Sequence, residues 1–462
     1  MSGFELIVAF AISIVVMIFA ISKLKIHPFL SIMTVSLALG LVAGIPLINQ
    51  TVDGKVTLGL ANVIGAGFSG TFTSIGIVII LGALIGSILE VTGAAFKLAD
   101  MVVKLVGPRH PELAIELMGW VVSVPVFCDS GFVILNPIRK AMVQRTRTSS
   151  VAMTVALSAG LYASHVFVPP TPGPIAAANT LGVGNNLLLV IAVGAVVSIP
   201  ALLGSYIYAK FIGRKVKSAD ELKTDEVAKT YEEIVAEYGE LPGGFLALSP
   251  IVVPILLMSL GSIAAMAKWE GNLFAVSSFL GTPIIALAVG TICGVFLLAS
   301  THTLNKFYDI TNDTLKTVGP ILFVTAAGGV LGRVIAVSGM VEYITANSSM
   351  LETVGIFFPF ILAAILKTAQ GSSTVAITTS AGIMAPLMEM MGFASPLLSA
   401  LTVMAIGAGA MTVSHANDSY FWVVTNFGDM TPQQGYKTQT MVTLVEGLCA
   451  MAGIYAFAAL LR

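Results

Sequence analysis

The chain has 462 residues, of which 56% are hydrophobic and 10% are charged, and its mean hydropathy is +0.95. These values lie far outside the range of soluble domains and predict an integral membrane protein. The formal net charge of -1 excludes the basic surface that nucleic-acid binding needs, and the three cysteines have neither disulfide-framework nor zinc-site spacing.

Apolar stretches long enough to span a bilayer recur along the whole chain. The first follows Glu5 and precedes Lys23 and Lys25, the reverse of a signal peptide, and predicts a helix that enters from outside. A span needs about 20 residues. Hydropathy predicts spans at 4–21, 28–48, 73–92, 149–168, 184–209, 245–266, 281–300, 318–338, 397–428 and 440–461.

Two further apolar stretches, 111–143 and 355–391, are too long for one span. As a single helix the first would reach about 50 Å, whereas the hydrocarbon core is about 30 Å thick. Basic residues flank it on both sides, which places both of its ends in the cytoplasm. The pattern predicts a re-entrant hairpin whose tip lies at Cys128-Asp129-Ser130-Gly131.

An internal duplication is predicted from matching motifs in the two halves. Gly82-Ala-Leu-Ile-Gly86 matches Gly328-Gly-Val-Leu-Gly332, Ser164-His165 matches Ser414-His415, and the break at Asp129 matches a second one at 370–374. Counting spans gives the copies opposite orientations, an architecture typical of secondary transporters. We predict an all-α polytopic protein with inverted repeats at 1–212 (scaffold 1–92, transport part 111–182) and 245–462 (transport part 355–428), joined by a cytoplasmic linker at 213–244.

Each repeat is expected to bring one hairpin tip and one broken helix to the membrane midplane. Ser130, Ser372 or Ser373, and Asn417 or Asp418 suit helix N-caps, and Pro174 suits a first helical position. Four helix N-termini would then direct free N–H groups at one carboxylate. The predicted substrate-binding residues are Ser130, Gly131, Thr171, Gly173, Gln370, Gly371, Ser372, Ser373, Thr374 and Asn417.

Ionisable residues beside these breaks predict coupling to protons. Burial favours the neutral form of a carboxyl, so a protonated Asp129 or Asp418 would no longer repel a bound anion. The alternatives are that both aspartates only cap helices and that the paired His165 and His415 are structural. Lys367 is expected to pair with Asp418 or with the substrate. Glu116 is expected at the membrane surface with Glu112, outside the site.

Four motifs resemble those of the gluconate permease family. They are Val-Phe-Cys-Asp-Ser-Gly-Phe-Val-Ile from 126, Ser-His-Val-Phe-Val-Pro-Pro-Thr-Pro-Gly-Pro from 164, Lys-Thr-Ala-Gln-Gly-Ser-Ser-Thr-Val-Ala from 367 and Ser-His-Ala-Asn-Asp-Ser-Tyr-Phe-Trp-Val from 414. The resemblance implies proton-coupled uptake of gluconate or a related sugar acid across a bacterial inner membrane. It also implies a homodimer in which the transport domain moves against a scaffold, while family members also carry fructuronate, glycerate or D-serine.

The hypothesis from the sequence is therefore a secondary active importer of a hydroxy-carboxylate, without cofactor or metal. An enzyme would use His165 and Asp129 as an acid–base pair, but no nucleophile, metal triad or cofactor motif accompanies them. The third hypothesis is a cation/proton antiporter with the same fold.

Overall fold

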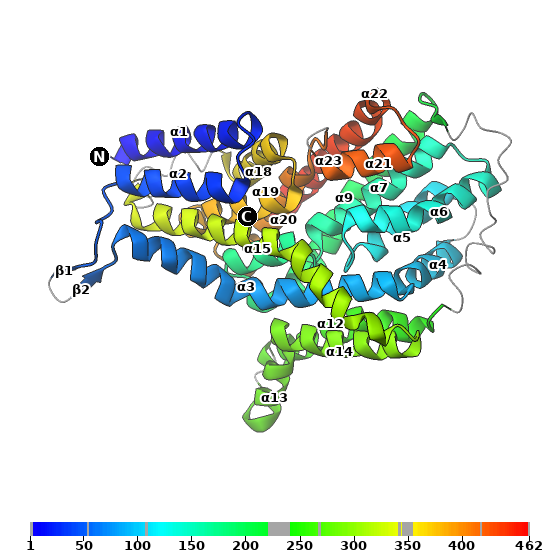
Figure 1. The fold of residues 1–462 in the computed structure, drawn as a ribbon, viewed down its shortest axis with the longest axis horizontal. Helices are drawn as coiled ribbons and strands as arrows, with labels where there is room; N and C mark the ends of the chain where they lie inside the picture. Colours follow the sequence, from blue (N-terminus) through cyan, green and yellow to red (C-terminus); the bar gives the residue numbers. More distant parts are fainter. Residues whose placement is uncertain are drawn as a thin grey trace.

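The fold is almost entirely helical (Figure 1). The structure is a computed structural model that describes residues 3–52, 55–106, 110–219, 241–266, 269–340, 343, 354–415 and 418–460. The predicted linker at 213–244 falls mostly outside the described residues. The predicted domain boundaries therefore stay a prediction.

The first half of the described chain contains nine α-helices and one two-stranded antiparallel sheet. These elements are α1 (Gly3–Ser22), α2 (Pro28–Val42), β1 (Gln50–Val52), β2 (Lys55–Thr57), α3 (Leu60–Val91), α4 (Ala94–Val106), α5 (Pro111–Val122), α6 (Cys128–Thr146), α7 (Ser150–Phe167), α8 (Pro172–Thr180), the 3₁₀ turn η1 (Gly184–Asn186) and α9 (Leu187–Gly213).

The second half of the described chain repeats much of this order. It contains α12 (Gly244–Met266), α13 (Gly271–Gly281), α14 (Pro283–Ser300), the 3₁₀ turn η2 (Leu304–Lys306), α15 (Phe307–Val337), α18 (Phe357–Gln370), α19 (Ser373–Met384), the 3₁₀ turn η3 (Ala385–Leu387), α20 (Pro396–Met411), α21 (Ser419–Phe427), α22 (Pro432–Gly435), the π-helical turn η4 (Tyr436–Thr440) and α23 (Met441–Leu460).

Among the described residues, eight helical segments are long and apolar enough to cross a membrane, which confirms a multi-pass membrane protein. Both overlong stretches are broken, as predicted, with α5 and α6 in the first and α18 and α19 in the second. That both ends of each hairpin lie on one side of the bilayer stays a prediction. α4 and α13 were not predicted from the sequence, and α3 and α15 begin earlier in the chain than predicted.

The two long helices α3 and α15 occupy matching places in the duplicated sequence and run side by side (Figure 1). A Cβ on Gly67 would meet Val330, near the start of α3 and the end of α15, whereas Ser87 accepts a hydrogen bond from Thr314 at the opposite ends. The matched helices are therefore antiparallel. This is the relation that an inverted repeat requires.

The centre of the molecule is formed by α7 and α20, in which nearly every residue is buried. Both helices are rich in Ala, Gly, Ser and Thr, and such small residues let helix backbones approach closely in a membrane protein. A Cβ on Gly160 would come within 1.9 Å of the Glu116 carbonyl oxygen, so glycine is required where α7 crosses α5.

Arg139 anchors the end of the first hairpin to the second repeat. Its fully buried guanidinium donates to the Asn136 side chain at 2.7 Å, to the Ser150 hydroxyl at 2.6 Å and to the Phe427 carbonyl at 3.3 Å. The adjacent Lys140 forms an ion pair with Asp429 at 3.0 Å. The chain between α6 and α7 is thus tied to the end of α21.

Candidate functional site

The first hairpin presents Asp129 from the first turn of α6. The break between α5 and α6 covers 123–127, a few residues before the predicted tip, and Phe127 rather than a polar residue occupies the N-cap. Ser130 is therefore inside the helix, so its prediction as a cap was wrong. Asp129 does not cap the helix either, because its carboxylate accepts a hydrogen bond from the Ser419 hydroxyl at 3.2 Å. Gly131 is buried against Leu161.

The second hairpin turns at Gly371, whose φ of +83° is in the left-handed region that favours glycine. Ser372 caps α19 by accepting from the Val375 N–H at 3.3 Å, as predicted. Lys367 lies in the last turn of α18 and donates to the Gly371 carbonyl at 2.5 Å. Its ammonium thereby stabilises the turn between the two hairpin arms. The side chain of Gln370 lies outside the described residues.

The break between α20 and α21 provides the partner of Lys367. Asp418 caps α21, as predicted, by accepting from the Tyr420 N–H at 3.1 Å. Its other carboxylate oxygen accepts from Lys367 at 2.6 Å and from the Ser414 hydroxyl at 2.5 Å. The side chains of Lys367 and Asp418 are 0% and 6% exposed, so this is a buried ion pair and the expected pairing is confirmed. Asn417 lies outside the described residues.

The break between α7 and α8 contributes backbone rather than side-chain donors. α8 begins at Pro172, so the prediction that Pro174 is its first residue was wrong. The Thr171 hydroxyl donates to the Val168 carbonyl at 2.8 Å, and its oxygen can still accept hydrogen bonds. A Cβ on Gly173 would meet Ile377 of α19 at 2.9 Å. The start of α8 therefore packs against the second hairpin.

An aromatic cluster surrounds the ion pair and joins the two repeats. It contains a tilted pair of Tyr162 and Tyr420 with centroids 5.2 Å apart, and the Lys367 ammonium lies 5.8 Å from the Tyr162 ring centroid. His165 is 5% exposed and lies parallel to Tyr162, and its Nδ1 has no hydrogen-bond partner among the described residues. Phe127 and Phe132 of the first hairpin complete the cluster.

Asp129, Lys367 and Asp418 lie close enough to interact electrostatically, which brings both hairpins to one place. His165 also interacts with Lys367 and Asp418. The predicted residues Ser373 and Thr374 are buried at the start of α19. His415 is only partly buried, so the two histidines of the duplication have different surroundings.

Several residues of this region were not predicted from the sequence. Tyr162, Tyr420 and Ser414 were not proposed as site residues, although Ser414 and Tyr420 lie within a quoted motif. Glu116 was expected at the membrane surface, but its side chain is 0% exposed, so it is enclosed by protein rather than lying at an exposed surface. Its carboxyl contacts Ser205 of α9 at 2.6 Å.

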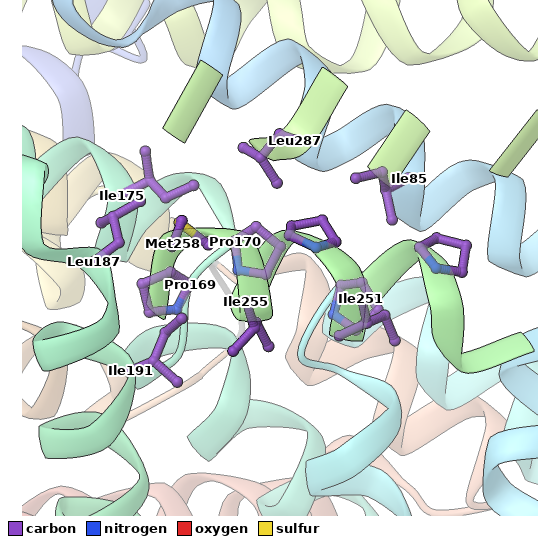
Figure 2. Close-up of a pocket in the computed structure, with 13 residues that line it drawn as sticks. Ile85, Pro169, Pro170, Ile175, Leu187, Ile191, Ile251, Ile255, Met258 and Leu287 are labelled. Atoms are coloured by element: carbon purple, nitrogen blue, oxygen red, sulfur yellow. The ribbon is translucent and has the colours of Figure 1, made fainter. Parts of the chain in front are cut away.

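A narrow apolar crevice separates the scaffold helices from the breaks (Figure 2). Ile85, Met258 and Leu287 face Pro169, Pro170 and Ile175 across it. Its volume is about 20 Å³, close to that of one water molecule, and its lining is apolar. A hydroxy-carboxylate does not fit there. The crevice therefore marks a dry contact between α3, α12 and α14 on one side and α8, α9 and the break before α8 on the other.

The match to a family model decides the classification. The model described as GntP family permease matches residues 5–460, which is nearly the whole chain. The chain belongs to the GntP permease family. This confirms the resemblance found in the motifs, and because the family consists of permeases, the enzyme alternative is set aside.

Individual GntP relatives support this classification. The chain is 34% identical over 428 residues to an uncharacterized permease of Haemophilus influenzae, covering 90% of this chain and 85% of the relative. It is 31% identical to the gluconate permease of Zymomonas mobilis, covering 97% and 96%. The solved structure of the Alcanivorax borkumensis YdaH transporter has a TM-score of 0.65 at 16% identity, covering 94% of this chain and 97% of that one, and shows a shared fold. The protein is thus a multi-pass GntP permease of a bacterial cytoplasmic membrane.

Proposed function

We propose that this permease imports gluconate or a closely related hydroxy-carboxylate together with protons. The observation that carries the proposal is the grouping of Asp129 with the buried Lys367–Asp418 pair at the meeting point of both hairpins. The relative from Zymomonas mobilis is a gluconate permease, which supports gluconate as the substrate.

Charge balance at this site explains the coupling. Lys367 and Asp418 neutralise one another at 2.6 Å, so Asp129 is the carboxyl without a cation of its own. A substrate carboxylate beside an ionised Asp129 would place two uncompensated negative charges in a poorly solvated site. A proton on Asp129 removes this repulsion. The substrate and the proton would then enter the site together.

The helix ends supply the attraction for the substrate. The N-termini of α6, α8, α19 and α21 surround the site and carry N–H groups without intrahelical partners. The hydroxyls of Thr171, Ser372, Ser373 and Thr374 would bind the substrate hydroxyls. Ser130, Gly131, Gly173, Gln370, Gly371 and Asn417 remain substrate-binding proposals, and Asp129, His165, His415 and Asp418 remain proton-coupling proposals.

The apolar crevice suits movement of the transport part along the scaffold. Its lining makes few directional contacts, so sliding breaks few hydrogen bonds. We propose an elevator-type exchange of the site between the two membrane faces. The working unit would be a homodimer in lipid, as the family resemblance implies.

Uptake into proteoliposomes tests the proposal. Radiolabelled gluconate should accumulate when the outside is acidic, and Asp129→Asn should keep gluconate counterflow while losing accumulation. Asp313→Asn is the control, because Asp313 is exposed and pairs with the exposed Lys316. Full accumulation by the Asp129 variant would refute the proton role. Sodium efflux without gluconate uptake would favour the antiporter, and competition with fructuronate, glycerate and D-serine would identify the substrate.

A further inference from the structure

Two buried glutamates on α5 and α23 lie outside the site described above. Glu116 is in the second turn of α5 and Glu446 is in the second turn of α23, and both are 0% exposed. Ser205 of α9 contacts Glu116 at 2.6 Å, and a Cβ on the preceding Gly204 would meet Cys449 of α23, so both glutamates lie beside the same turn of α9 and interact electrostatically. Together they form a pair of carboxyl groups that the substrate site does not use.

The contacts of Glu116 suit a protonated carboxyl. The Ser205 oxygen lies 2.6 Å from Glu116 Oε1 and 3.0 Å from the Ala201 carbonyl. The Ser205 hydroxyl has one proton and can donate it to only one of these two oxygens, so a protonated Glu116 can donate to Ser205 whenever that proton goes to the Ala201 carbonyl. Among the described residues, Glu116 Oε2 and both carboxyl oxygens of Glu446 have no hydrogen-bond partner.

No cation in the described part of the chain pairs with either glutamate. The charges acting on Glu446 are those of Glu116 and Cys449, and Glu446 in turn acts on Tyr420. α20 has no ionisable residue. The described ionisable residues of the other elements packed against α5 and α23 are Lys97 and Lys104 of α4, Cys128, Asp129, Arg139 and Lys140 of α6, Tyr162 and His165 of α7, Tyr206, Tyr208 and Lys210 of α9, and Tyr436 and Lys437 of η4.

Burial without a cation determines the state of the pair. An isolated buried carboxylate costs several kcal/mol, and a second negative charge beside it adds repulsion. The resting pair therefore holds protons, and removal of one of them leaves a charge that the second carboxyl can stabilise by a hydrogen bond. Such a pair binds and releases protons rather than a metal.

Two hydrogen-bonded routes run from the substrate site toward the pair and stop short of Glu446, whose carboxyl oxygens have no hydrogen-bond partner among the described residues. Gln439 of η4 and Thr443 of α23 lie seven and three residues before Glu446 in the sequence. Thr443 accepts from the Ser414 N–H at 2.9 Å, and the Ser414 hydroxyl donates to Asp418.

The second route passes through Ser158. Its hydroxyl donates to Gln439 Oε1 at 2.5 Å, and its carbonyl accepts from the Tyr420 hydroxyl at 3.0 Å. The amide nitrogen of Gln439 and the indole nitrogen of Trp120, one turn after Glu116, are buried without hydrogen-bond partners among the described residues. Buried polar atoms of this kind are where ordered water binds, and water would complete a path for protons.

We propose that Glu116 and Glu446 form a proton-binding site that receives the coupling proton from the substrate site and releases it to the cytoplasm. This inference rests on the proposed function. The pair first releases one proton to the cytoplasm, which breaks an O–H bond and leaves one carboxylate. The O–H bond at Asp129 then breaks, the proton moves along hydroxyls and water, and the O–H bond at the glutamate pair forms again. The N-terminal ends of α5 and α23, where the pair lies, are on the side predicted to be cytoplasmic.

The test separates proton movement from substrate movement in proteoliposomes. Glu446→Gln and Glu116→Gln remove the titrating group and keep the shape and neutrality of a protonated glutamate. We expect both variants to keep gluconate counterflow within about twofold of the unaltered protein and to lose gluconate-driven proton uptake, measured with a trapped pH dye. If one proton is coupled to each gluconate, a difference of one pH unit should drive about tenfold accumulation of gluconate by the unaltered protein. The two glutamine variants should show no accumulation. Glu446→Asp should restore part of it.

Glu112→Gln is the matched control, because Glu112 lies one turn before Glu116 on α5 and is partly exposed. It should leave both readouts unchanged. Proton uptake at the unaltered level in both glutamine variants would overturn the inference, and so would loss of counterflow in a variant that keeps its thermal stability. Accumulation driven by sodium in place of protons would also overturn it. Failure of the unaltered protein to accumulate gluconate would instead refute the proposed function.

Discussion

The buried pair of Lys367 and Asp418 predicts strong energetic coupling between two residues 51 positions apart. Asp418→Asn removes one charge and keeps an oxygen that can still cap α21, whereas Lys367→Met keeps most of the aliphatic stem. Each single change leaves its partner as a buried, uncompensated charge. The double variant Lys367→Met/Asp418→Asn leaves neither charge. A double-mutant cycle therefore isolates the pair.

The burial of the pair sets the size of the effect. The ammonium and carboxylate are 2.6 Å apart and their side chains are 0% and 6% exposed, so water provides little compensation. Loss of one partner of such a pair costs about 3–5 kcal/mol, or roughly two to four powers of ten in the ratio of folded to unfolded protein. The double variant should be less destabilised than the sum by about 2–3 kcal/mol.

Unfolding by sodium dodecyl sulfate in mixed micelles, followed by circular dichroism, would measure these free energies. The exposed pair of Lys316 and Asp313, at 2.8 Å, is the control and should show no measurable coupling, because solvent screens it. If the two changes at Lys367 and Asp418 were additive within about 0.5 kcal/mol, the ion pair would not hold the second hairpin to α21 and the description of the site would fail.

Three further predictions concern packing. Arg139→Ala should destabilise the fold by about 3 kcal/mol, because it leaves buried acceptors at Asn136 and Ser150 unpaired, while the exposed Arg214→Ala should have little effect on thermal stability in detergent. Gly160→Ala should lower that stability by more than 1 kcal/mol through a clash with α5, whereas Gly65→Ala, with open space around it, should be neutral or stabilising. Met258→Trp should fill the apolar crevice and slow gluconate counterflow at least tenfold without loss of folding, while the exposed Leu256→Trp on the same helix should not. Equal rates in the two α12 variants would argue against sliding at this interface.

Much of the architecture was predictable because membrane constraints are simple. Hydropathy identified eight of the ten predicted spans, whereas 28–48 and 397–428 hold shorter helices. Excess length identified the broken stretches 111–143 and 355–391, and small-residue motifs identified the matched helices α3 and α15. Local chemistry identified the helix caps Ser372 and Asp418.

The misplaced residues depend on tertiary packing. Ser130 looked like a cap, but α6 begins at Cys128, and its N-cap is Phe127, whose ring packs against His165. Glu116 looked like a surface residue, but its carboxyl is buried against Ser205 of α9, 89 positions away in the sequence. Glu446 is an isolated acidic residue in an apolar helix, and that signal alone could have marked it.

The duplicated long helices hold their neighbours unequally. On α15, Gly328 and Gly332 lie against Thr378 and Gly382 of a hairpin arm, whereas the matching Gly82 and Gly86 on α3 lie against Pro170 and Pro125 in the turns. One copy therefore contacts a helix and the other contacts two turns. If these contacts were exchanged between the copies, the chain would adopt a second arrangement related to the first by the two-fold pseudosymmetry of the repeats, and we expect the proposed alternating access to use these two arrangements.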